Sequence, residues 1–132
     1  MNEQEYFIVV DDDELNSQLF EIIIRHVSRE AKATGFNDAE EALRYLAENY
    51  NEGHKNTILF VDVNMPFLSG WEFLDLYDKL PDHIKKQVRV YMLSSSIDQN
   101  DRRRAMADKN VTGYLEKPLT TDIINSIRSN KE

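Results

Sequence analysis

The chain has 132 residues, lacks cysteine, and carries 24 acidic residues against 16 lysines and arginines, which gives a net charge of −8. Its length suits one domain with a self-sufficient core, and without cysteine there is no disulfide framework, no cysteine-ligated zinc site and no thiol nucleophile. The acidic balance argues against nucleic-acid binding, which needs a basic face, and against adhesion to an anionic membrane.

No apolar run approaches the roughly 20 residues that span a bilayer. Residues 1–5 are acidic, whereas a secretory signal peptide would begin with a basic segment. Charged residues make up 30% of the chain and hydrophobic residues 41%, as is usual for soluble globular proteins. We therefore expect a single soluble, cytoplasmic domain over residues 1–132.

Short runs rich in β-branched and aromatic residues alternate with segments of helical period along the chain. The runs at 6–10 and 57–61 are continuous, which is typical of strands covered on both faces. The weakest strand candidate is residues 31–34, which Gly35 closes. In chain order we expect a strand at 6–10, a helix over 15–27, a strand at 31–34, a helix over 39–47, a strand at 57–61, a helix over 71–77, a strand at 88–93, a helix over 98–109, a strand at 111–115 and a helix over 119–127.

Four of these helices carry an apolar stripe, and the helix over 98–109 is mostly polar, with three consecutive arginines at 102–104. Strand and helix alternate five times, which predicts an α/β fold: a five-stranded, doubly wound parallel sheet with helices on both faces. In the first helix the stripe consists of Leu15, Leu19, Ile22, Ile23 and Val27.

The residues that follow each strand are the informative ones, because ligands of an open α/β sheet bind beyond the carboxyl ends of its strands. The first strand ends in Asp11, Asp12 and Asp13, and the third in Asp62. The fourth ends in Ser94–Ser96 and the fifth in Glu116, Lys117 and Pro118. The sequence therefore predicts carboxylates, a hydroxyl and an ammonium at one rim.

Such a rim suits phosphoryl transfer. Clustered carboxylates repel one another unless a cation lies among them, and hard oxygen ligands suit Mg²⁺. Lys117 and Ser94 would stabilise charge on a transferring phosphoryl group. Asp62 is the best candidate nucleophile, since it ends a central apolar strand and could form an aspartyl phosphate.

These residues resemble the receiver domains of two-component response regulators, and the resemblance spans nearly the whole chain. It implies the (βα)5 flavodoxin-like topology of that family. The motifs that carry it are Val10-Asp11-Asp12, residues 61–66 (Val-Asp-Val-Asn-Met-Pro) with Gly70, Ser94-Ser95, and Lys117-Pro118.

The resemblance implies that a histidine kinase or histidine phosphotransfer protein donates a phosphoryl group to Asp62. Mg²⁺ would be held by Asp12, Asp62 and the main-chain carbonyl of Asn64, with Asp11 acting through a water molecule. The chain would be a phosphorelay switch that changes conformation to engage a partner. It would hydrolyse its own phosphate slowly without being a conventional enzyme.

The same resemblance assigns roles to the remaining residues. Lys117 would pair with the phosphoryl oxygens, and the Lys117–Pro118 bond would be cis. Ser94 would move to bind the phosphoryl group while Tyr114 turns inward as the aromatic switch. Asn64 and Ser96 occupy the positions that tune the lifetime of the phosphate. The chain would be a stand-alone receiver, because it ends after its fifth predicted helix. It would be a monomer or a weak homodimer.

Other readings remain open at this stage. A Mg²⁺-dependent phosphatase resembling haloacid dehalogenases needs a second aspartate where Asn64 stands. A flavin mononucleotide carrier would need a hydroxyl- and glycine-rich loop where Asp11–Asp13 would repel its phosphate. A degenerate receiver that acts as a scaffold is disfavoured by the intact site residues. Asp13 is expected to cap a helix, and His26, His54 and His83 to be surface residues.

Overall fold

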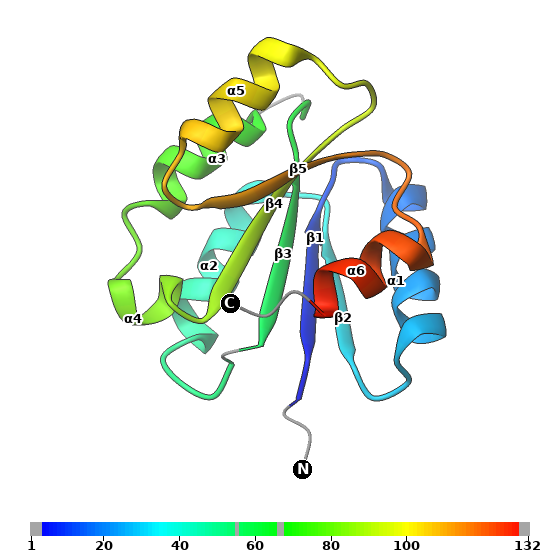
Figure 1. Ribbon diagram of the computed structural model, residues 1–132. Coiled ribbons are helices and arrows are strands. Elements are labelled where there is room, and N and C mark those ends of the chain that lie inside the picture. Colours follow the sequence, from blue (N-terminus) through cyan, green and yellow to red (C-terminus); the bar gives the residue numbers. More distant parts are fainter. Residues whose placement is uncertain (1–3, 55, 66–67, 130–132) are drawn as a thin grey trace.

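The computed structural model describes residues 4–54, 56–65 and 68–129, in which five parallel strands form one sheet (Figure 1). Their order is β2-β1-β3-β4-β5, so the chain reverses direction across the sheet between β1 and β3. This arrangement confirms the predicted fold class. The strands are β1 (Tyr6–Val10), β2 (Lys32–Phe36), β3 (Thr57–Asp62), β4 (Val88–Ser94) and β5 (Val111–Glu116).

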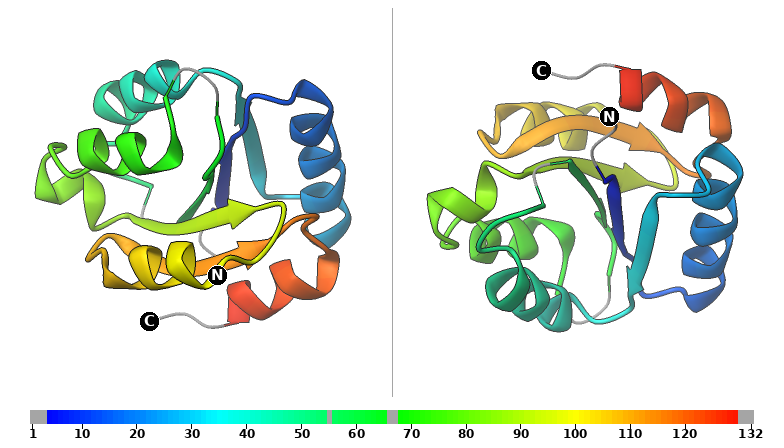
Figure 2. Two further views of the ribbon diagram at one scale, coloured as in Figure 1. Left: turned by 90° about the horizontal axis from the view of Figure 1, so that it is seen from above. Right: turned by 90° about the horizontal axis from the view of Figure 1, so that it is seen from below.

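Helices cover both faces of the sheet (Figure 2). Helix α4 was not predicted: it is a single turn that follows Pro81. None of the described helices is long and apolar enough to cross a membrane. The helices are α1 (Glu14–Val27), α2 (Ala39–Asn49), α3 (Gly70–Tyr77), α4 (Asp82–Lys85), α5 (Gln99–Ala107) and α6 (Thr121–Ser129).

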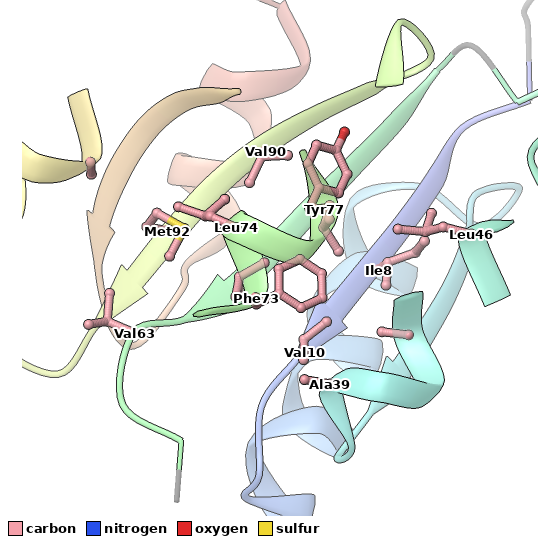
Figure 3. Close-up of a cluster of buried hydrophobic side chains, with 14 of the residues drawn as sticks. Ile8, Val10, Ala39, Leu46, Val63, Phe73, Leu74, Tyr77, Val90 and Met92 are labelled. Carbon is pink, nitrogen blue, oxygen red and sulfur yellow. The ribbon is translucent and has the colours of Figure 1, made fainter. Parts of the chain in front are cut away.

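Alternate residues of the central strands enter two separate cores, because successive side chains of a strand point to opposite faces. Phe7 and Val9 join Phe20 and Ile24 of α1 and the buried face of α6. Ile8 and Val10 join the core formed by α2, α3, α4 and α5. Figure 3 shows side chains of this second core gathered between the sheet and helices α2 and α3. The central strands are therefore buried on both faces, and they carry Asp11 and Asp62 at their carboxyl ends.

The apolar stripe predicted for α1 is only partly its buried face. Leu15, Leu19 and Ile22 are 62%, 49% and 58% exposed. Phe20 and Ile24 are buried instead, and the ring of Phe20 meets Phe60 of β3 edge-on at 5.5 Å between centroids. The prediction failed here because α1 has apolar residues around much of its circumference, so periodicity alone did not identify the face against the sheet.

Strand β2 begins at Lys32 and continues through Gly35 to Phe36, so Gly35 does not close the strand as we expected. A Cβ atom at Gly35 would lie 3.0 Å from the Cβ of Ser17. The glycine therefore allows α1 to approach the edge strand closely. Its place in the sequence reflects helix–strand packing and not a turn.

The junction between β3 and α3 is compact at the place where it carries Asp62. A Cβ atom at Gly70 would lie 2.7 Å from the main-chain oxygen of Asp62, and the Gly70 N–H donates to Val63 O at 3.0 Å. Ser69 and Glu72 form a capping box that fixes the start of α3. The start of α3 is thus packed directly against the end of β3.

Candidate functional site

The carboxyl ends of β1 and β3 bring three carboxylates together. Asp11, Asp12 and Asp62 each offer an oxygen, and these oxygens lie within 4.8 Å of one another. Asp11 and Asp62 are only 1% and 4% exposed, whereas Asp12 is exposed. The predicted convergence of strand ends therefore produces a half-open acidic cluster at the rim of the sheet.

Lys117 faces this cluster from the end of β5. Its Nζ lies 3.0 Å from Asp11 Oδ2 and 3.0 Å from Asp62 Oδ2, so one ammonium bridges both buried carboxylates. The Lys117 N–H donates to Ser94 O at 2.8 Å, and the Lys117–Pro118 bond is cis, as expected. Residues far apart in the chain thus form one charged site.

Main-chain groups hold the two buried carboxylates in place. The Asp13 N–H donates to Asp11 Oδ1 at 2.9 Å, and the Asn64 N–H donates to Asp62 Oδ1 at 3.0 Å. In both cases the donor lies two residues after the acceptor. The turn that follows each strand therefore orients the aspartate at the end of that strand. The second oxygen of each carboxylate, Oδ2, faces Lys117.

Burial raises the pKa of Asp62, and the repulsion from Asp11 adds to this effect. Hydrogen bonds from Asn64 and Lys117 offset part of the increase. Burial acts against the charge on Lys117, but its hydrogen bonds to Asp11 and Asp62 outweigh that and raise the pKa of Lys117. Even with Lys117 in place, the cluster holds more negative than positive charge, because one ammonium faces three carboxylates.

This shift makes the effect of Asp62→Asn depend on pH. In the folded chain the Asp62 carboxyl has a pKa above the ordinary value of 3.8, so ionisation costs stability as the pH rises between the unfolded and folded pKa values. Without Mg²⁺, Asp62→Asn should therefore raise the thermal midpoint at neutral pH. The gain should shrink as the pH is lowered toward 3.8. Thermal denaturation in EDTA across a pH series measures this, and a gain that grows on acidification would contradict it.

The donor set fits a magnesium ion. Mg²⁺ prefers hard oxygen ligands and commonly binds through one or two carboxylates while keeping several waters. Asp12 and Asp62 can supply such ligands, and Asp11 lies close enough to contribute. The loop that holds Asn64 begins beside Asp62, and Asn64 is exposed. Pro66, the last residue of the motif over residues 61–66, lies outside the described residues.

Ser94 ends β4 with its hydroxyl turned to its own loop. The side chain is buried, and its Oγ donates to Ser96 O at 2.6 Å and accepts from the Ser96 N–H at 3.3 Å. Sequence reasoning placed the hydroxyl at the rim but missed this local hydrogen bond, because both partners lie in a serine run that gives no signal of direction. In this structure the Ser94 hydroxyl is thus engaged within its own loop.

Tyr114 lies inward, 8% exposed, in the core on the side of α5. Among the described residues its hydroxyl has no hydrogen-bond partner. A buried hydroxyl without a partner costs free energy, so this ring is held inward by its apolar contacts.

Two expectations outside the cluster have clear outcomes. Asp13 caps α1 by accepting from the Leu15 N–H at 2.9 Å, as predicted. His54 is half-buried and not a simple surface residue: its ring contacts those of Tyr6 and Tyr50, with centroid distances of 4.6 and 4.2 Å. His26 and His83 are exposed.

Helix α5 contacts Trp71 of α3, which the sequence did not indicate. The Arg104 guanidinium lies 4.5 Å from the centroid of the Trp71 ring and joins α5 to α3. All three arginines at 102–104 are exposed on α5. Arg104 is therefore engaged between two helices, and Arg103 donates to Asn100 Oδ1 within α5 at 2.8 Å.

A family model described as "Response regulator receiver domain" matches residues 7–128. The chain belongs to this family. A two-component response regulator from Cytophaga hutchinsonii has a crystal structure that superposes with a TM-score of 0.87 at 31% identity, covering 97% of this chain and 96% of that one. Membership in the receiver family excludes the phosphatase and flavin-carrier readings and makes this a phosphorylation-dependent signalling domain.

Two further relatives extend the comparison. The cyclic di-GMP phosphodiesterase response regulator RpfG of Xanthomonas campestris pv. campestris (strain 8004) is 26% identical over 113 residues, which are 85% of this receiver and 28% of that protein. The receiver therefore spans little more than a quarter of that relative. The receiver domain of the sensor histidine kinase PA1611 from Pseudomonas aeruginosa PAO1 has the same fold at 18% identity, with a TM-score of 0.74 over 96% of this chain and 95% of that one. It is described with a magnesium ion coordinated in its active site cleft.

Proposed function

We propose that this receiver accepts a phosphoryl group on Asp62, with Mg²⁺, from a histidine kinase or a histidine phosphotransfer protein, and then engages a partner protein. The observation that carries the proposal is the Lys117 ammonium at 3.0 Å from both Asp11 and Asp62. A scaffold without phosphorylation would have no need to bury two carboxylates around one lysine, because that arrangement costs desolvation energy.

In the proposed reaction a carboxylate oxygen of Asp62 attacks the phosphorus of a phosphohistidine. The P–O bond forms, the P–N bond breaks, and the imidazole leaves with a proton from solvent. Asp12, Asp62 and the main-chain carbonyl of Asn64 would hold Mg²⁺, with Asp11 acting through water. The ion would neutralise charge on the phosphoryl oxygens. Lys117 would turn from the carboxylates to a phosphoryl oxygen and stabilise the same charge.

Slow hydrolysis would end the signal. Water attacks the phosphorus, the bond to Asp62 breaks, and inorganic phosphate leaves with the carboxylate restored. The side chains of Asn64 and Ser96 would tune this lifetime from either side of the phosphoryl group. Asn64 is exposed beside Asp62, and Ser96 is hydrogen-bonded to Ser94 in the loop after β4, which supports roles at the entrance to the site.

Ser94 and Tyr114 would transmit the change. The Ser94 hydroxyl would exchange Ser96 O for a phosphoryl oxygen, and the loop after β4 would rearrange with it. Tyr114 already lies inward. Phosphorylation would therefore stabilise an arrangement in which the ring keeps this position. A partner that binds this arrangement more tightly would read the signal as a population shift.

We also propose that residues 1–132 act as a single receiver domain in the cytoplasm, as a monomer or weak homodimer, without binding nucleic acid or membrane. The net charge of −8 supports the last part, since both surfaces are anionic.

Incubation with acetyl phosphate tests the central proposal. Intact mass spectrometry should find one phosphoryl adduct that is lost in base, as expected of an acyl phosphate, and that forms with Mg²⁺ but not in EDTA. An equal adduct in EDTA, or none under any condition, would contradict the proposal and favour a scaffold.

A further inference from the structure

Asn16, in the first turn of α1, contacts the oxygen of Asp11 that the main chain leaves free of a hydrogen bond. Its Nδ2 donates to Asp11 Oδ2 at 3.3 Å, and this oxygen also accepts from Lys117 Nζ at 3.0 Å. Asn16 is half-buried and has no charge of its own. It thus adds a neutral donor to the oxygen that Lys117 serves.

The Asp11 carboxylate depends on protein donors because Asp11 is 1% exposed. Within the described chain these donors are the Asp13 N–H on Oδ1, and Asn16 with Lys117 on Oδ2. A buried carboxylate that loses hydrogen bonds either rotates to find others or takes up a proton. Removing a donor from Oδ2 should therefore change the orientation of Asp11.

Lys117 is shared between two carboxylates, and under the proposed function it turns to the phosphoryl group. Asn16 would then be the side-chain donor that stays on Asp11 Oδ2. A neutral amide can do this without repelling a cation, whereas an ammonium in its place would oppose Mg²⁺. Outer partners of this kind orient the groups around a metal ion.

The surroundings of Asn16 allow the role to be tested cleanly. Asn16 lines a cavity of about 380 Å³ between α1 and the segment after β5, and its neighbours there include Leu19, Ile23 and Leu119. A leucine at position 16 has the branched shape of asparagine but is bulkier, and the cavity offers it room among these apolar walls. It would remove the amide while keeping the packing.

We propose that Asn16 is a positioning residue that holds the Asp11 carboxylate in the orientation that supports Mg²⁺ binding. This inference rests on the proposed function, since it assumes that the cluster binds Mg²⁺.

Isothermal titration calorimetry with Mg²⁺ alone tests it on the full chain. Asn16→Leu and Asn16→Ala should each weaken Mg²⁺ binding about three- to tenfold, the loss expected for one neutral hydrogen bond around a metal site. The same two substitutions at Gln18, which is exposed on α1, should leave the affinity within twofold of the native chain. The Mg²⁺ concentration for half-maximal phosphorylation by acetyl phosphate should rise in parallel, while the rate at saturating Mg²⁺ stays within twofold.

The outcomes separate the two hypotheses. If the native chain binds no Mg²⁺, the proposed function fails and the role of Asn16 fails with it. If the native chain binds Mg²⁺ and both Asn16 variants bind it equally well, only the role of Asn16 is overturned. A lower thermal midpoint with unchanged Mg²⁺ affinity would likewise overturn it, because Asn16 would then serve stability alone.

Discussion

Asp62→Asn is expected to abolish the phosphoryl adduct that the native chain forms with acetyl phosphate and Mg²⁺. The amide has no anionic oxygen to attack phosphorus, and the neighbouring carboxylates do not replace it: Asp11 is held by three donors and Asp12 is exposed to solvent. Intact mass spectrometry should find less than about one hundredth of the native adduct, in line with losses seen when an essential catalytic group is removed.

Asp13→Asn is the matched control for this prediction. Asp13 immediately follows Asp11 and Asp12, but its carboxylate caps α1, with Oδ1 accepting from the Leu15 N–H. Asparagine caps helices about as well as aspartate, so this variant should be phosphorylated at the native rate. Undiminished phosphorylation of Asp62→Asn would move the acceptor to another side chain, which peptide mapping would locate.

Lys117→Met is expected to destabilise the chain in EDTA by about 2 to 4 kcal/mol, because it leaves two buried carboxylates facing each other without their shared cation. Saturating Mg²⁺ should restore much of the loss, since an ion bound to the folded state stabilises it by mass action. Phosphorylation should nevertheless remain about 10² to 10³ slower, because the donor to the phosphoryl oxygen is gone. Chemical denaturation with and without Mg²⁺ measures the first effect.

Lys85→Met supplies the comparison. Lys85 is about as buried as Lys117, with 15% of its side chain exposed against 19%, and it also pairs with two carboxylates. Those carboxylates, Asp78 and Asp82, are themselves 43% and 88% exposed. We expect a smaller loss of stability and no recovery with Mg²⁺. Equal behaviour of the two variants would mean that Lys117 is an ordinary structural lysine.

The site was more predictable than parts of the fold that surround it, and the reason is geometric. Parallel strands end at one edge of a sheet, so Asp11, Asp62 and Lys117 had to converge once their strands were recognised. The hydrogen bonds that the main chain donates to Asp11 and Asp62, from the N–H groups of Asp13 and Asn64, also follow from the turns at the strand ends. The grouping of these residues at one edge of the sheet could therefore be predicted without knowing how the side chains pack.

What could not be predicted depends on packing between elements. Nothing in the sequence distinguishes Leu15 and Leu19, which are exposed, from Phe20 and Ile24, which are buried, because all four recur at helical spacing. The direction of the Ser94 hydroxyl depends on the path of a polar loop. Asn16 was missed because an asparagine in the first turn of a helix is usually unremarkable. The spacing of five residues between Asn16 and Asp11 does not by itself indicate a hydrogen bond between their side chains.

The strand that supplies Lys117 lies at the margin of the sheet. Among the described strands, β5 is hydrogen-bonded to β4 alone, whereas β1 and β3, which supply the carboxylates, each have a strand on either side. Marginal segments open with less free energy than central ones. On warming, the positive half of the site should therefore detach while its negative half stays assembled, and the domain should become unresponsive to phosphodonors before it melts.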